Sequence, residues 1–210
     1  MNDGNTDGKG VAAARGRTAL EASDIVQAGL LIALLAVSAQ ISVAVGPIPF
    51  TLQTLVVTLA ALVFTPGQAA LALAGYIVLG ALGLPVFSAM RGGVAVLLGP
   101  TGGFVYGFAL SALSGSLARL LVCPPAARAG SPRRALVADV LAGVVAIVVC
   151  YAVGTVHFVL MSAAGGSPVG VAYALGACVV PFVVPDAAKA AAAIAVAHAL
   201  RRAVPSVSRH

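Results

Sequence analysis

Long apolar stretches, separated by short breaks rich in proline and glycine, run along most of this 210-residue chain. An apolar run of about 20 residues is long enough to cross a lipid bilayer as a helix. The pattern therefore predicts an all-α integral membrane protein with six transmembrane helices, of which the second is short enough to be tilted or partly re-entrant. The predicted helices cover residues 25–45, 51–64, 68–84, 104–122, 135–161 and 169–200.

Polar segments at both ends frame a single membrane domain. We expect residues 1–20 to form a disordered cytoplasmic tail, residues 21–203 to form the six-helix domain, and residues 204–210 to form a second cytoplasmic tail. An even number of spans places both termini on one side of the membrane. Arginines gather before the first span, in the loop before the fifth and after the last. The positive-inside rule therefore places both termini in the cytoplasm of a multi-pass protein of the cell membrane.

The composition excludes several classes of protein. With 60% hydrophobic and 9% charged residues, the chain is not an ordinary soluble domain. Its net charge of +6 comes largely from the arginines that flank the spans, so it indicates membrane topology and not binding to nucleic acid. The sequence contains no phosphate-binding loop, no metal-like cysteine spacing and no nucleophile–base constellation. We therefore expect neither an enzyme nor a cofactor or metal site, and any ATP-driven step belongs to another chain.

Asp186 and Lys189 are ionisable residues within the last apolar run. A charged side chain at membrane depth costs roughly 2.5–3.5 kcal/mol on insertion scales, so such residues usually mark a binding site or a pathway. Their spacing of three positions places both on one face of a helix. Pro181 and Pro185, just before them, remove amide donors and leave carbonyl groups free. These features favour a binding site for a polar solute; the alternative is an ion pair that only fixes helix packing.

Two connections on the outer side carry further polar candidates. Thr51 and Gln53 follow the break after the first span. Thr51 is equally explained as a helix cap, whereas an amide within an apolar segment, such as that of Gln53, needs a polar partner. Residues 88–103 form a long glycine-rich segment, which we expect to be an irregular lid over the outer mouth. Arg91 within this segment is expected either to bind a ligand carboxylate or to rest among lipid headgroups.

Two ionisable residues in the fifth span are expected to serve the structure of the bundle. His157 is predicted to be a neutral histidine that is hydrogen-bonded within the bundle. Asp139 is predicted to pair with arginines on the cytoplasmic side. Neither side chain is expected to contact a solute.

Four motifs resemble those of the BioY family, the biotin-capturing S components of energy-coupling-factor (ECF) transporters. They occur in the family's order within a match that runs from about residue 25 to residue 202, and the four together are specific. The motifs are Gly46-Pro-Ile-Pro-Phe-Thr-Leu-Gln-Thr54, Leu79-Gly-Ala-Leu-Gly-Leu-Pro-Val-Phe87, Leu98-Gly-Pro-Thr-Gly-Gly103 and Val184-Pro-Asp-Ala-Ala-Lys189.

The resemblance implies a six-helix S-component fold that binds biotin, as the transported substrate, near the outer face. It also implies that the first and third connections cover the site, and that the partners are a transmembrane coupling subunit and ABC-type ATPases. The motif positions that match are Asp186, Lys189, Thr51 and Gln53, and Arg91, Gly92 and Gly93 stand where the family commonly has a glycine-rich stretch.

The chemistry of biotin suits these residues. Asp186 is expected to accept hydrogen bonds from the ureido N–H groups, and Lys189 to donate to the ureido oxygen or to the carboxylate. The thiophane ring and the aliphatic tail need apolar walls, for which Phe50, Phe87 and Tyr151 are candidates. The alternatives to biotin uptake are an S component for another vitamin, a membrane scaffold that transports nothing, and a proton-coupled channel.

Overall fold

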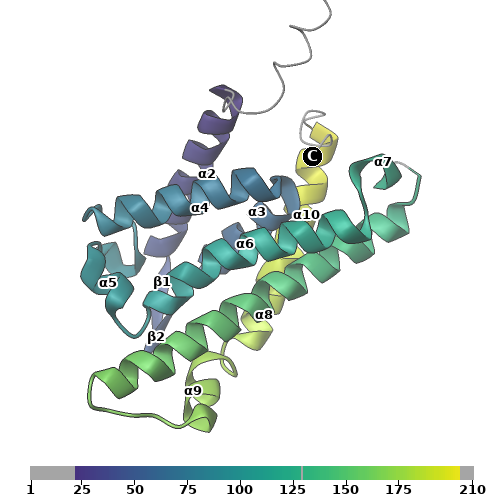
Figure 1. The fold of residues 1–210 in the computed structure, drawn as a ribbon. Helices are drawn as coiled ribbons and strands as arrows, with labels where there is room; N and C mark the ends of the chain where they lie inside the picture. The colour runs from purple at the N-terminus through teal and green to yellow at the C-terminus, as the bar shows by residue number, and fades with distance from the viewer. Residues whose placement is uncertain (1–21, 129, 204–210) are drawn as a thin grey trace, which may run out of the picture.

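The structure is a computed structural model that describes residues 22–128 and 130–203. It is a helical bundle with one small sheet (Figure 1). The two predicted tails, residues 1–20 and 204–210, lie outside the described residues. The longer helices are α2 (Ala22–Gln40), α3 (Gln53–Val63), α4 (Pro66–Ala81), α6 (Gly102–Val122), α8 (Pro132–Ala164) and α10 (Val183–Ala203). The shorter elements are β1 (Ser42–Val45), β2 (Ile48–Thr51), η1 (Ser88–Met90), α5 (Val94–Leu98), α7 (Pro125–Arg128) and α9 (Val171–Cys178).

Within the described residues, three helices are long and apolar enough to cross a membrane, namely α6, α8 and α10. The described apolar parts of α2, α3 and α4 are shorter. The 11 residues of α3 rise only about 16 Å at 1.5 Å per residue, which is roughly half of a hydrocarbon core. The second predicted helix is therefore short, as expected, and it packs among α2, α6, α8 and α10 in the middle of the bundle.

A β-hairpin replaces the end of the first predicted span, so the all-α prediction is wrong at this point. Helix α2 ends at Gln40, and β1 then pairs antiparallel with β2. Gly46 has a φ of 67°, the left-handed value that a two-residue hairpin loop requires at its first position. The strands are apolar and short, and apolar character alone does not distinguish them from a continuing helix.

The last predicted span, residues 169–200, is also not one helix. It divides into α9 and α10, because the chain turns at Val179–Phe182. Proline at 181 cannot supply the amide that a continuous helix would need, whereas Pro185 lies in the first turn of α10, where a missing amide costs nothing. The division places Asp186 in the first turn of α10. Residues 88–103, predicted to be irregular, likewise contain η1 and α5.

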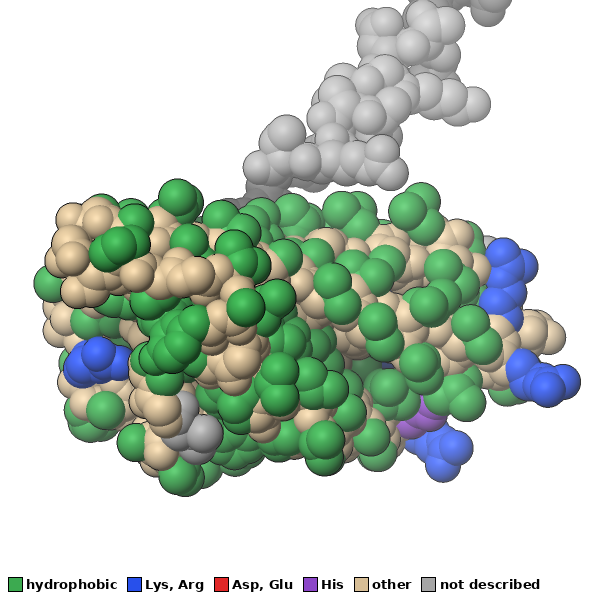
Figure 2. Space-filling view, turned by 90° about the horizontal axis from the view of Figure 1, so that it is seen from below, with side chains coloured by type: hydrophobic (Ala, Val, Ile, Leu, Met, Phe, Trp, Pro, Cys, Tyr) green, Lys and Arg blue, Asp and Glu red, His purple; other side chains and the backbone are tan. Residues whose placement is uncertain are grey.

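Small residues allow α6 and α8 to pack along most of their length (Figure 1). A Cβ added to Gly107 would lie 3.2 Å from the carbonyl oxygen of Cys150, and one added to Gly115 would lie 2.9 Å from that of Ala142. The main core forms where α2, α3, α4 and α6 meet. Figure 2 shows hydrophobic side chains across one face of the bundle, with most of the visible basic side chains at one end, as expected for a surface that contacts lipid.

A cluster of ionisable side chains ties four helices together at the end of the bundle where α10 ends. Asp139 of α8 is 1% exposed, and it accepts hydrogen bonds from Arg119 Nε and Arg201 Nη1, each over 2.7 Å. His198 Nε2 lies 2.9 Å from the same carboxylate, and Arg201 also donates to the carbonyl of Leu62 in α3. The prediction that Asp139 pairs with arginines is confirmed, and Arg119, buried within α6, was missed.

Candidate substrate-binding site

A cavity of about 690 Å³, the space at its opening included, lies at the other end of the bundle. The hairpin, the segment before α5 and helices α3, α4, α6, α8 and α10 all contribute to its wall. The predicted site residues that line it are Thr51, Gln53, Phe87, Arg91, Tyr151, Asp186 and Lys189.

The side chain of Asp186 accepts three hydrogen bonds at the cavity wall. Its Oδ1 accepts hydrogen bonds from Thr54 Oγ1 over 2.8 Å and from Lys189 Nζ over 2.7 Å. Its Oδ2 accepts from the hydroxyl of Tyr151 over 2.7 Å. The carboxylate is only 3% exposed, so its ionised form depends on these donors. The contacts hold both oxygens in fixed positions at the cavity wall.

Lys189 lies one turn further along α10 and joins this helix to the hairpin. Its ammonium group donates to the carbonyl of Thr51 over 2.6 Å, to Thr54 Oγ1 over 3.1 Å and to Asp186. It also lies 3.7 Å from the centre of the Phe50 ring, which allows a cation–π contact. Phe50 itself contacts Lys189 and Phe182 and is not among the residues that line the cavity.

Gln53 begins a second chain of hydrogen bonds along the cavity. Its Nε2 donates to the hydroxyl of Tyr76 over 2.7 Å, and that hydroxyl donates to the carbonyl of Val86 over 2.8 Å. Its Oε1 accepts from Thr51 Oγ1 over 3.2 Å. The expected polar partner of Gln53 is thus Tyr76 of α4. Thr51 Oγ1 also accepts from the Gln53 amide over 3.3 Å, so Thr51 bonds to the first residue of α3 and lines the cavity, whereas the N-cap of α3 is Leu52.

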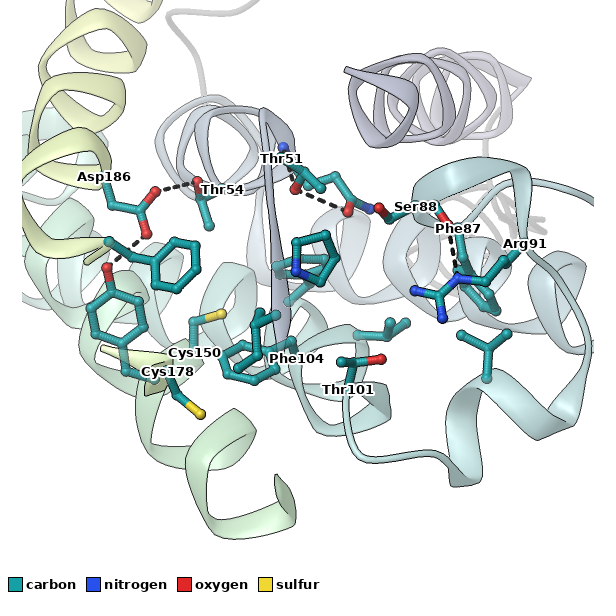
Figure 3. Close-up of a pocket in the computed structure, with 18 of the residues that line it drawn as sticks. Thr51, Thr54, Phe87, Ser88, Arg91, Thr101, Phe104, Cys150, Cys178 and Asp186 are labelled. Atoms are coloured by element: carbon teal, nitrogen blue, oxygen red, sulfur yellow. Dashed lines mark hydrogen bonds between the residues drawn. The ribbon is translucent and has the colours of Figure 1, made fainter. Parts of the chain in front are cut away.

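Arg91 and Ser88 provide polar groups on a different part of the wall. Arg91 Nε donates to the carbonyl of Ser88 over 3.1 Å, and both residues line the cavity. The Ser88 hydroxyl is buried without a hydrogen-bond partner among the described residues. In Figure 3, Asp186 and Arg91 lie on opposite sides of the cavity. The cavity therefore has an acid–base pair on one side and a cation with a hydroxyl group on the other.

Gly92 and Gly93 do not line the cavity, although they were predicted to be site residues. A Cβ on Gly92 would overlap the backbone of Gly83 and Leu84, and Gly93 has a φ of 92°. These glycines are needed for the path of the backbone beside Arg91, which accounts for the glycine-rich composition of this segment.

Comparison with known proteins assigns the chain to a family. The model described as "BioY family" matches residues 12–206. The chain belongs to the BioY family. This membership confirms the resemblance seen in the four motifs, and with it the prediction that the protein is not an enzyme.

Curated members of the BioY family match much of the chain. A Pyrococcus horikoshii protein named "Probable biotin transporter BioY" is 37% identical over 182 residues, which cover 87% of this chain and 98% of the relative. The Thermotoga maritima protein "Biotin transporter BioY" is 50% identical over 88 residues, which cover 42% of this chain and 52% of the relative.

A solved structure of the S-component for biotin from an ECF-type ABC transporter superposes with a TM-score of 0.72 at 19% identity. The superposition covers 86% of this chain and 91% of that one, and it confirms the S-component fold of this BioY-family protein.

The sequence did not indicate several polar residues that complete the site. Thr54 holds Asp186, Tyr76 bonds to Gln53, and Ser88 lines the cavity. Tyr151 is predicted from the sequence only as an apolar wall, but its hydroxyl also holds Asp186. Threonine, serine and tyrosine are common in apolar helices, so their presence alone does not indicate a binding site. The sequence carries a signal only for Thr54. Thr54 lies one position beyond Gln53 in the first motif and one helical turn before another polar residue, Thr58.

Proposed function

We propose that this protein is the biotin-binding membrane subunit of a vitamin importer, and that biotin is its transported substrate and not a cofactor. The observation that carries the proposal is the buried pair of Asp186 and Lys189 on the wall of a cavity, in a chain of the BioY family. A buried acid–base pair is a poor stabiliser after desolvation, and a cavity beside it offers a reason for its presence.

The two sides of the cavity suit the two ends of biotin. The ureido group is neutral, with N–H donors and a carbonyl acceptor, and it matches the acid–base pair, which is neutral as a whole. In this proposal Asp186 accepts from the ureido N–H groups and Lys189 donates to the ureido oxygen. The biotin carboxylate then lies near Arg91 and the Ser88 hydroxyl, because the described residues offer Arg91 no acidic partner. A guanidinium binds a carboxylate through two parallel hydrogen bonds.

Apolar side chains between the two sides suit the thiophane ring and the aliphatic tail. Phe87, Phe104 and Phe108 line this part of the cavity. Phe87 is held edge-to-face against Tyr76, with 5.5 Å between the ring centres, so its position is coupled to the chain of hydrogen bonds from Gln53. Phe50 acts in this proposal through Lys189, whose ammonium group lies over its ring.

The topology and the partners are part of the same proposal. All six longer helices cross the cell membrane, with both termini in the cytoplasm and the cavity toward the outside. The shorter helices α2, α3 and α4 cross it with the help of flanking segments. A transmembrane coupling subunit and ABC-type ATPases supply the energy for release, since the sequence carries no nucleotide-binding motif.

Identification of the small molecule that copurifies tests the proposal. The protein is purified in mild detergent from cells grown with biotin, and the extract is analysed by mass spectrometry. Thermal unfolding is then compared with added biotin, riboflavin or thiamin, because a ligand that binds only the folded state raises the midpoint. We expect that only biotin copurifies and that only biotin raises the midpoint temperature of thermal unfolding. A shift by riboflavin or thiamin alone would identify another vitamin, and no shift at all would reject binding.

A further inference from the structure

Gln40 lies between two segments that cover the cavity. The first cover is the hairpin of residues 42–51, which supplies Ile48, Pro49 and Thr51 to the cavity wall and begins two residues after Gln40. The second cover is the loop of residues 85–91, which supplies Phe87, Ser88 and Arg91. Gln40 is the last residue of α2, so its backbone leads directly into the first cover.

The side chain of Gln40 bonds to the second cover on both sides of its turn. Its Nε2 donates to the carbonyl groups of Pro85 and Phe87, each over 3.3 Å, and to Ala36 of its own helix over 3.1 Å. Its Oε1 accepts from the Met90 amide over 2.9 Å. A carboxamide donates from its nitrogen and accepts at its oxygen, and here it pairs three backbone groups of the second cover.

The second cover needs such a hold because its backbone is strained. Ala89 and Met90 have φ values of 58° and 55°, both in the left-handed region. This region is unfavourable for residues with a side chain, and two such residues in sequence are rare. The loop is closed by a hydrogen bond from the Phe87 amide to the Arg91 carbonyl over 2.9 Å. Strained segments persist only where the surroundings fix them, and here Gln40 bonds to one of the two strained residues directly.

We propose that Gln40 is a positioning residue that holds the two covers closed over the substrate and makes them move together. The inference rests on the proposed function, because it concerns how the bound solute is retained. When the Gln40 bonds break, the second cover relaxes from its left-handed turn and withdraws Ser88 and Arg91 from the cavity. The same event frees the junction between α2 and the first cover.

Dissociation of radiolabelled biotin from the purified protein tests this role. We expect Gln40→Ala to accelerate dissociation about tenfold, the effect of losing one or two hydrogen bonds, with a smaller change in the association rate. Gln40→Glu keeps the shape and the acceptor but removes the donors, so it should also accelerate dissociation. Gln27→Ala, near the start of the same helix, is the matched control. Dissociation rates within twofold of wild type for both Gln40 variants would overturn the proposal.

A rescue variant separates positioning from a merely structural role. Glycine adopts the left-handed region without strain, so Ala89→Gly should restore slow dissociation, at least in part, when it is combined with Gln40→Ala. A general loss of packing at Gln40 would not respond to a change in the preferred φ of Ala89. Failure of the rescue, with both single variants well folded, would contradict the link to the strained turn.

Hydrogen exchange of the ligand-free protein tests the hold without any substrate. We expect Gln40→Ala to accelerate exchange of the Met90 amide and its neighbours in the second cover, and Gln27→Ala to leave it unchanged. If the wild-type protein does not bind biotin but this difference is present, the proposed function fails, and with it the role of Gln40 in retaining biotin, while the hold of Gln40 on the second cover stands. If biotin binds and neither exchange nor dissociation changes, the role of Gln40 fails and the proposed function stands.

Discussion

Asp186 Oδ1 and Lys189 Nζ lie 2.7 Å apart, one turn from each other on α10, and both side chains are more than nine-tenths buried. The pair contacts three other elements, through Tyr151 of α8, Thr54 of α3 and the carbonyl of Thr51 in the hairpin. A change in either charge therefore affects the cavity wall and the packing of the bundle, and these two effects can be separated by experiment.

Asp186→Asn should weaken biotin binding by about 100-fold and destabilise the protein by about 3 kcal/mol. It removes a charged acceptor, and it leaves Lys189 buried without its counter-charge. Titration calorimetry measures the first effect and thermal unfolding in detergent the second. The double variant Asp186→Asn with Lys189→Met removes both charges, so it should recover stability but not binding. Biotin affinity equal to wild type in the double variant would show that the pair serves structure alone.

Arg91→Ala should lower the affinity for biotin by about tenfold or more while changing that for biotin amide little. The proposed orientation places the biotin carboxylate near Arg91, and a charged hydrogen bond contributes about 1.5–3 kcal/mol. Competition binding with biotin and biotin amide measures the difference. Arg202→Ala, an exposed arginine at the far end of α10, is the control. An equal loss for both ligands would contradict the proposed orientation.

Asp139→Asn should destabilise the protein by about 3–5 kcal/mol and leave the biotin affinity of the folded protein near that of wild type. The buried guanidinium group of Arg119, a residue that is 4% exposed, would lose the Asp139 carboxylate as its counter-charge. Arg201 would lose the same counter-charge. The cluster lies at the opposite end of α10 from Asp186, so it does not contact the cavity. Thermal unfolding and calorimetry on the same samples test both statements. A large loss of affinity without a loss of stability would contradict them.

Gly80→Ala should displace Phe87 from the cavity wall. A Cβ at Gly80 would overlap the Phe87 ring, which is 2% exposed and has little room to move. Overpacking of this kind costs about 1–3 kcal/mol, and we expect biotin affinity to fall as well. Gly29→Ala in α2 is the matched control, because nothing lies within 4 Å of the added Cβ. Thermal unfolding and biotin titration measure the stability and the biotin affinity of both variants. Equal stability and equal affinity in the two variants would refute the prediction.

Particular residues show why the site was only partly predictable. Asp186 and Lys189 were evident because charges within an apolar run are costly, and the four motifs indicated Thr51 and Gln53. Thr54, Tyr76 and Ser88 were not evident, because a hydroxyl in a membrane helix is common and only its partner reveals its role. The Thr54–Asp186 contact joins residues 132 positions apart. Gly92 and Gly93 were correctly noted as unusual, but the structure places their effect on the backbone and not on the cavity.

The sequence by itself determined the membrane class, the family and the ionisable pair, since each depends on composition, motif or local spacing. Only the tertiary structure decided that residues 42–51 form a hairpin, that 169–200 divides into two helices, and that Gln40 bonds to a strained loop. The physical reason is common to all three. Apolar character indicates only that a segment avoids water. The conformation of the segment depends on which distant backbone and side-chain groups satisfy its hydrogen bonds.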